Sequence, residues 1–102
     1  MKAEEHYNLG VRYQGQGAQD QAIQEFQAAI GRRLDYAEAY NNLGTAYQSL
    51  GRHDQAIRAY QRSVEVKPDM IQGYHNLCNL LQGEVDQAIT AYQGVIHTLS
   101  LN

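Results

Sequence analysis

The chain has 102 residues, a formal net charge of −3 and an isoelectric point near 5.7, so its length fits one domain and its charge excludes a strongly basic surface for nucleic acid or anionic membrane. Met1 to His6 contain no apolar run, and no stretch approaches the roughly 20 apolar residues of a membrane span. These features predict a cytoplasmic location, while the single cysteine, Cys78, cannot form an internal disulfide.

A 34-residue repeat organises the sequence. One copy begins at Ala3, a second at Ala37, and a third, looser copy at Ile71. Repeats of this period indicate a solenoid or a propeller, in which each unit buries its apolar face only against its neighbours. The sequence therefore predicts one domain over residues 1–102. The matching segments are Asn8-Leu9-Gly10, Asn42-Leu43-Gly44 and Asn76-Leu77, followed by Asp20-Gln21-Ala22-Ile23, Asp54-Gln55-Ala56-Ile57 and Asp86-Gln87-Ala88-Ile89.

Each of the first two copies predicts a pair of helices. In the second copy the apolar positions follow the i, i+3, i+4, i+7 spacing of one helical face, from Tyr40 to Tyr47. Gly51 then stops the first helix, and Pro68 stops the second. We expect repeats at about 3–36, 37–70 and 71–102, and the predicted helices of the first two are 3–15, 19–32, 37–50 and 53–66.

The third copy departs from this plan at its centre. From Leu77 to Ala88 it is two residues shorter than the matching segment of the second copy, and the missing pair falls between Gln82 and Gly83. We predict helices over 71–82 and 85–99, joined by a tighter corner. No apolar alternation long enough for a strand is present, so the expected fold is all-α.

The pattern of the second copy resembles the tetratricopeptide repeat. The residues that carry the resemblance are Tyr40, Leu43-Gly44, Tyr47, Ala56, Tyr60 and Pro68. Ala37-Glu38-Ala39-Tyr40-Asn41-Asn42-Leu43-Gly44 is also similar to the repeats in the superhelix of O-linked N-acetylglucosamine transferase. The resemblance covers residues 3 to about 100. It implies an α-solenoid of three tandem helix-turn-helix repeats that form a segment of a right-handed superhelix.

Small residues recur where the two helices of a repeat are expected to cross. Gly10, Gly44 and Cys78 occupy this place on the first helices, and Ala22, Ala56 and Ala88 supply a small face on the second. Tyr13, Tyr47, Tyr60 and Tyr92 have core spacing, so we interpret them as packing residues.

In proteins with such repeats the first helix of each unit lines a concave groove that binds peptide or protein segments. An amide side chain offers a donor and an acceptor, as a peptide unit does, so a ladder of amides predicts binding to an extended peptide. Alternatively, the same asparagines hold successive helices together. The ladder consists of Asn8, Asn42 and Asn76 with Gln14, Gln48 and Gln82, and its neighbours are Tyr7, Asn41, His75, Thr45 and Asn79.

The sequence gives little support for a carboxylate-binding clamp, a metal site or a catalytic site. In this family a clamp of Lys, Arg and Asn holds the C-terminal carboxylate of chaperones, and only Asn42 fits it here, which argues against a chaperone tail as ligand. His75 and Cys78 lack a convergent third ligand for a metal. No nucleophile and base can be paired, so we predict no catalytic residues and no cofactor.

A second interpretation places the main contact at the end of the chain. The last predicted helix keeps core-type residues although no further repeat follows it, and exposed apolar surface of this kind marks association sites. We expect either a homo-oligomer through this helix or further repeats in a longer parent chain. The residues concerned are Ile89, Tyr92, Ile96 and Leu99.

Overall fold

The computed structural model describes residues 1–101, except for the side chains at positions 95, 98, 99 and 101. The elements are α1 (Ala3–Gly15), α2 (Gln19–Arg32), α3 (Ala37–Ser49), α4 (His53–Val66) and α5 (Ile71–Leu101). Residues 1–101 contain no β-strand, so the prediction of an all-α fold is confirmed. The bounds of α1 to α4 agree with the predicted helices to within one residue.

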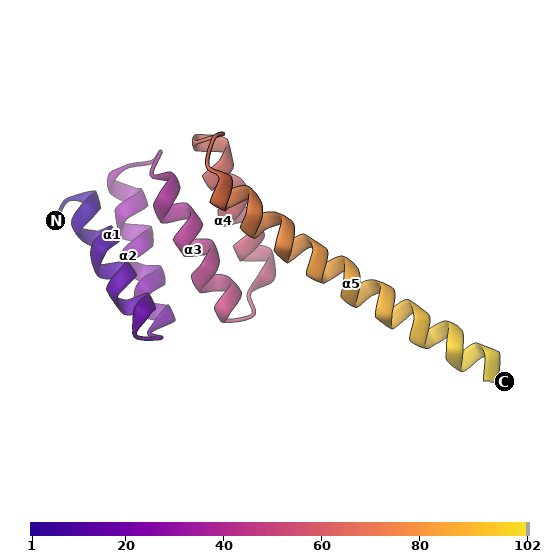
Figure 1. The fold of residues 1–102 in the computed structure, drawn as a ribbon. Helices are drawn as coiled ribbons and strands as arrows, with labels where there is room; N and C mark the ends of the chain where they lie inside the picture. The colour runs from indigo at the N-terminus through magenta and orange to yellow at the C-terminus, as the bar shows by residue number, and fades with distance from the viewer. Residues whose placement is uncertain (102) are drawn as a thin grey trace.

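Consecutive helices pack side by side as an α-solenoid (Figure 1). α1 and α2 form one antiparallel pair and α3 and α4 form the next, while α2 packs on α3 and α4 packs on α5. The molecule is elongated, with principal extents of 63 × 29 × 17 Å. Its long dimension arises because α5 leaves the stack and projects away from it (Figure 1). None of the described helices combines the length and hydrophobicity that a membrane crossing requires.

The turns inside the first two repeats depend on a glycine with a left-handed backbone. Gly17 has φ of 78° and Gly51 has φ of 74°, a conformation that strains any residue with a Cβ atom. After each glycine a backbone N–H reaches back to the end of the first helix: Ala18 donates to the Tyr13 carbonyl and Arg52 to the Tyr47 carbonyl, both at 2.9 Å. This capping motif satisfies carbonyls that the helix end leaves free and reverses the chain.

The third repeat has no such turn, so the prediction of two separate helices with a corner at Gln82-Gly83 is wrong. α5 is one helix of 31 residues. In the second repeat the chain leaves the helix after Ser49 and turns over the next three residues, whereas the third repeat is two residues shorter at this point. Turning there would require unwinding the first helix. A continuous helix instead pairs its backbone groups along its whole length, at a cost of about 1 kcal/mol for Gly83 in a helix.

The core lies between the paired helices and depends on small residues at their crossings. A Cβ atom on Gly10 would lie 2.6 Å from the Phe26 ring, and one on Gly44 would lie 2.6 Å from the Tyr60 ring. The predicted packing role of these glycines is therefore confirmed. In the third repeat Cys78 and Ala88 are exposed because a straight α5 cannot bring them together. The prediction that Tyr92 lies in the core is wrong for the same reason.

Candidate functional site

Two hydrogen bonds of the same kind connect the first helices of successive repeats. Asn42 Nδ2 donates to the Tyr7 hydroxyl at 3.2 Å, and Asn76 Nδ2 donates to Asn41 Oδ1 at 3.0 Å. Both the donors and the acceptors are one repeat apart, so the first bond joins α1 to α3 and the second joins α3 to α5. Asn8, the equivalent residue of α1, is exposed.

The three glutamines of the predicted ladder differ in their contacts. Gln14 Nε2 donates to the Asn42 backbone carbonyl at 3.1 Å. Gln48 Oε1 accepts a hydrogen bond of 2.8 Å from the Tyr60 hydroxyl, within the second repeat. Gln82 Nε2 donates to Asp86 Oδ1 at 2.9 Å, one turn further along the straight α5. The glutamines therefore do not form a periodic row.

Asn41 lies beneath the surface formed by the first helices. Its side chain is 2% exposed, and its backbone carbonyl accepts a hydrogen bond of 3.1 Å from Thr45 Oγ1. The prediction that Asn41 lines a groove does not agree with this burial, because a ligand cannot reach the side chain in this conformation. Its side-chain oxygen accepts the hydrogen bond from Asn76 of α5. Sequence reasoning missed this distinction because Asn41 and Asn42 are adjacent and chemically identical.

Two tyrosine hydroxyls contact the amide side chains described above: Tyr7 with Asn42, and Tyr60 with Gln48. The Tyr7 ring packs against the rings of Phe26 and Tyr36, with centroids 5.9 and 5.1 Å away. Burial raises the pKa of Tyr7 above its ordinary value, although the hydrogen bond from Asn42 acts in the opposite direction. Burial likewise raises the pKa of Tyr60. Both hydroxyls therefore keep their protons at neutral pH and are available for hydrogen bonding.

The remaining predicted residues are distributed between the surface and the helix contacts. Asn79 Nδ2 and His75 Nε2 lie 3.1 Å apart on the exposed side of α5. The structure thus brings together polar groups from α1, α3 and the first half of α5. Exposed members are Asn8, Thr45, Gln48, His75, Asn79 and Gln82, and half-buried members are Tyr7, Gln14, Asn42 and Asn76.

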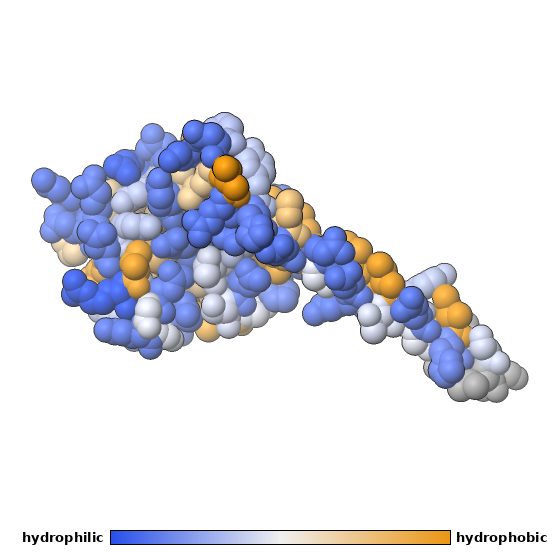
Figure 2. All heavy atoms as spheres, viewed as in Figure 1, coloured by the Kyte–Doolittle hydropathy of each residue, from blue (hydrophilic) through white to orange (hydrophobic). Residues whose placement is uncertain are grey.

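The predicted self-association residues lie on the projecting part of α5. Ile89, Tyr92 and Ile96 are 49%, 69% and 47% exposed, and the side chain of Leu99 lies outside the described residues. Apolar surface is visible along α5 beyond the stack (Figure 2). Val85 belongs to the same surface and was not predicted. The sequence contains a signal for it if residues 71–101 are treated as one helix. Val85 is seven residues from both Cys78 and Tyr92, and residues seven apart lie on the same face of a helix.

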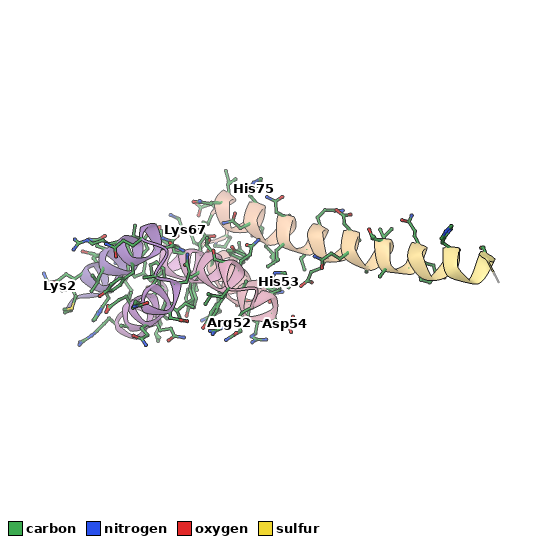
Figure 3. The ribbon with its side chains drawn as sticks, turned by 90° about the horizontal axis from the view of Figure 1, so that it is seen from below. Lys2, Arg52, His53, Asp54, Lys67 and His75 are labelled. Atoms are coloured by element: carbon green, nitrogen blue, oxygen red, sulfur yellow. The ribbon has the colours of Figure 1, made fainter. Side chains whose placement is uncertain are left out.

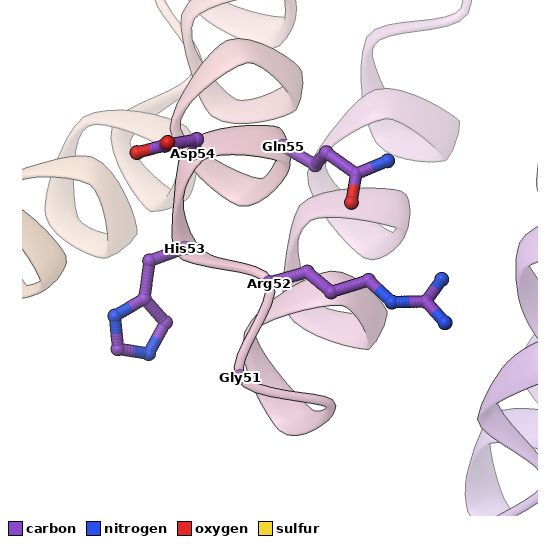
Figure 4. A pocket seen from close by; sticks show the side chains of 5 residues that line it. All are labelled: Gly51, Arg52, His53, Asp54 and Gln55. Atoms are coloured by element: carbon purple, nitrogen blue, oxygen red, sulfur yellow. The ribbon is translucent and has the colours of Figure 1, made fainter.

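A shallow hollow lies at the turn between α3 and α4 and is lined by residues 51–55 (Figure 4). Its side chains diverge: Arg52 and Gln55 extend to one side and His53 to the other. Arg52 lies 3.9 Å from Asp20, and His53 lies 4.0 Å from Glu84 of α5. These two contacts connect neighbouring helices around the turn, and Figure 3 labels Arg52, His53 and Asp54. Such a divergent set does not present converging groups to a substrate.

Comparison with known proteins identifies the repeat. Residues 37–70 match the tetratricopeptide repeat family. A comparison with curated protein sequences gives no significant match. Among solved structures, "Crystal structure of MamA" is 33% identical with a TM-score of 0.80, covering 94% of this chain and 57% of that one. "Crystal structure of MamA protein" is 34% identical with a TM-score of 0.79, covering 90% and 51%. This chain therefore spans little more than half of either protein.

Proposed function

We propose that this chain, which belongs to the tetratricopeptide repeat family, is a protein-interaction module that binds an extended peptide or protein segment and has no catalytic role. The segment lies along the first-helix face, which we define as the exposed side of α1, α3 and the first half of α5. The observation that carries the proposal is the repeated hydrogen bond made by Asn42 and Asn76. Each bond holds one asparagine side chain against the preceding first helix, and the two asparagines are one repeat apart.

The fixed asparagines keep binding capacity for a ligand. Each side-chain amide has two N–H donors and one oxygen with two lone pairs, and the bond to the neighbouring helix uses one donor. Among the described residues, neither the Asn42 nor the Asn76 side-chain oxygen accepts a hydrogen bond. A peptide unit offers a matching N–H and C=O. Prepositioned side chains also lose less conformational entropy on binding, which favours affinity.

The charges beside this face favour an uncharged or weakly basic segment. Glu4 lies 3.5 Å from Arg33, and Glu38 lies 3.4 Å from Lys67. These cations are thus occupied by carboxylates of the same chain. A carboxylate ligand needs unoccupied cationic partners to offset its desolvation, so an acidic segment or a C-terminal carboxylate is disfavoured.

Selection from a displayed random 12-residue peptide library tests the proposal. The best peptide is then measured by fluorescence anisotropy against wild type, Asn8→Ala and Asn79→Ala. Both residues are exposed, so these changes leave the bonds between helices intact. One lost hydrogen bond is worth about 0.5 to 1.5 kcal/mol, so each variant should bind about 2- to 12-fold more weakly. Gln24→Ala, at an exposed position of α2, is the control and should bind like wild type.

Two results would contradict peptide binding at this face. One is a library that yields no enriched peptide. The other is a peptide whose affinity is unchanged by Asn8→Ala and Asn79→Ala but reduced by Gln24→Ala. Asn42→Ala with Asn76→Ala is a stronger probe of the ladder, and it must be accompanied by thermal melts because both changes also remove bonds between helices.

A second candidate function is self-assembly through α5. It is favoured by the large apolar side chains that α5 exposes beyond the stack, from Val85 to Ile96. Each such side chain gains about 1.5 to 3 kcal/mol when it is fully removed from water. Sedimentation equilibrium of wild type and Ile96→Glu tests this function. The variant should shift the protein towards the monomer, and a wild type that is monomeric at high concentration would exclude it.

A further inference from the structure

α5 carries two apolar faces, and only one of them is covered. On the covered side Gly73 lies close to Val64 and Ser63 of α4, and Leu80 belongs to the buried core. The other face, here called the α5 stripe, consists of the residues from Tyr74 to Ile96 that fall within about 40° of Val85 on a helical wheel of 100° per residue. It holds no charged residue. Its members are Tyr74, Cys78, Leu81, Val85, Ile89, Tyr92 and Ile96, all of them exposed.

The first two repeats show what the residues of the α5 stripe normally contact. Gly10 lies under the Phe26 ring and Gly44 lies under the Tyr60 ring, each pair joining the two helices of one repeat. The equivalent residues of the third repeat are Cys78 and Tyr92. In the second repeat Tyr60 is 1% exposed, whereas Tyr92 is 69% exposed. The third repeat thus has both residues of the contact, Cys78 and Tyr92, but they do not touch each other within the chain.

One chain cannot close this contact while α5 stays continuous. Cys78 and Tyr92 are 14 residues apart on a single helix, which separates them by about 21 Å along its axis. They also point to the same side of that helix rather than towards each other. A second copy of the chain, placed antiparallel, offers each residue the partner that it has in the other repeats.

We propose that two copies pair through their α5 stripes in an antiparallel arrangement, so that residues 85–96 of each copy take the place of the missing second helix of the other. This inference rests on the self-assembly proposed above and specifies its geometry. Pairing Cys78 with the partner's Tyr92 sets the register, and it places Val85 against the partner's Val85 at the twofold axis. The contact is isologous, and exchange of an equivalent element is a low-cost route to a dimer.

The same register matches the rest of the stripe. Leu81 and Ile89 are each four residues from Val85, and Tyr74 and Ile96 are each eleven residues from it. Every member of the stripe therefore faces an apolar partner in this arrangement. The nearby carboxylates lie outside it: Glu84 lies 4.0 Å from His53 of α4, and Asp86 accepts the hydrogen bond from Gln82. In the pair each stack is extended by a helix from the other copy, which continues the packing of α4 on α5.

Disulfide cross-linking of the full chain under mild oxidation tests this register. A disulfide needs Cβ atoms about 3.5 to 4.5 Å apart. Tyr92→Cys, with the native Cys78 kept, should give a covalent dimer that peptide mapping assigns to a bond between residues 78 and 92. Val85→Cys combined with Cys78→Ala should give a dimer through residue 85. Wild type should not cross-link, since its two Cys78 residues are about 21 Å apart in this arrangement.

Thr90→Cys with native Cys78 is the matched control. Thr90 is exposed and two residues from Tyr92, but it lies on the opposite side of α5, so it should not form a bond to Cys78. Circular dichroism of each variant confirms that the helices are kept.

The mass of uncross-linked wild type separates failure of this register from failure of self-assembly. A dimer of twice 11.5 kDa that cross-links through Cys78 and Cys78 would overturn the antiparallel exchange while leaving self-assembly in place. A strict monomer would overturn both. A dimer with the bond between residues 78 and 92, and none in the Thr90→Cys control, supports the proposal.

Discussion

Asn76 Nδ2 donates a hydrogen bond of 3.0 Å to Oδ1 of Asn41, a side chain that is 2% exposed. The pair joins α3 to the first half of α5 in the same way that Asn42 and Tyr7 join α3 to α1. A repeated polar contact of this kind sets the register between neighbouring repeats, because a shift by one residue would leave a buried polar atom without a partner.

Replacing Asn76 by Ala should therefore destabilise the protein. The change leaves Asn41 Oδ1 buried without its donor, which costs about 1 to 3 kcal/mol. Asn79→Ala, on the exposed side of the same helix, should stay within about 0.5 kcal/mol of wild type. Urea unfolding followed by circular dichroism measures both. Equal stability of the two variants would mean that the bond between Asn76 and Asn41 contributes nothing.

The close approach at Gly44 predicts a second pair of variants. A Cβ at this position would meet the Tyr60 ring at 2.6 Å, so Gly44→Ala should overpack the crossing and cost about 1 to 3 kcal/mol. Gly31→Ala is the control, since a Cβ there meets nothing within 4 Å. In a helix this second change should be neutral or stabilising by up to about 1 kcal/mol. In thermal melts we expect Gly44→Ala to lower the melting temperature and Gly31→Ala to leave it unchanged or raise it. An unchanged melting temperature for Gly44→Ala would contradict the packing.

Alkaline pH should lower the stability of the fold. Burial raises the pKa of Tyr7 and of Tyr60 in the folded state, whereas in the unfolded state both titrate near 10. Between the two values the unfolded chain has lost protons that the folded chain still holds. The stabilisation is thus complete below pH of about 10 and is lost as pH rises through the folded pKa values. Urea midpoints should fall above pH of about 10, and they should fall less in Tyr7→Phe. Equal declines in both proteins would contradict a role for Tyr7.

Restoring the missing pair of residues should close the third repeat. Inserting Ser-Leu between Gln82 and Gly83 reproduces the length of the second repeat, in which Gly51 forms the left-handed turn. The second half of α5 can then fold back on the first, as α4 does on α3. Small-angle scattering at a concentration where both proteins are monomeric should give a smaller radius of gyration for the insertion variant. Inserting Ser-Leu after Gln93 instead is the control and should give no compaction.

Sequence periodicity predicts the first two repeats well because local and tertiary signals agree there. Gly17 and Gly51 end the first helices, and Gly10 and Gly44 admit the aromatic ring of the second. The third repeat keeps the residue pattern but lacks two residues at its corner, so the repeat signal and the backbone geometry disagree. The pattern alone does not show whether the chain continues the helix or unwinds it into a turn.

The candidate site shows a similar division. The recurrence of Asn42 and Asn76 is visible in the sequence, and so are the two roles that an asparagine can serve. Which groups they contact depends on how far α3 is shifted relative to α1 and α5. Asn41 is buried and Asn42 is more accessible because of this shift, and neither composition nor residue spacing predicts the difference.

The distance between Gln72 and Gln93 tests most directly whether α5 is continuous or folds back as a hairpin. Only a continuous α5 leaves residues 85–96 free to pack on another molecule. Spin labels at Gln72→Cys and Gln93→Cys, in Cys78→Ala and diluted with unlabelled protein, report the distance within one chain by pulsed electron resonance. A continuous α5 separates the two positions by about 31 Å along the helix axis. A third repeat that folds back as a hairpin would bring them to roughly 10 to 20 Å, since paired helices pack about 8 to 10 Å apart. A single distribution near 30 Å is the expected result, and a dominant short distance would contradict the open third repeat and the pairing that depends on it.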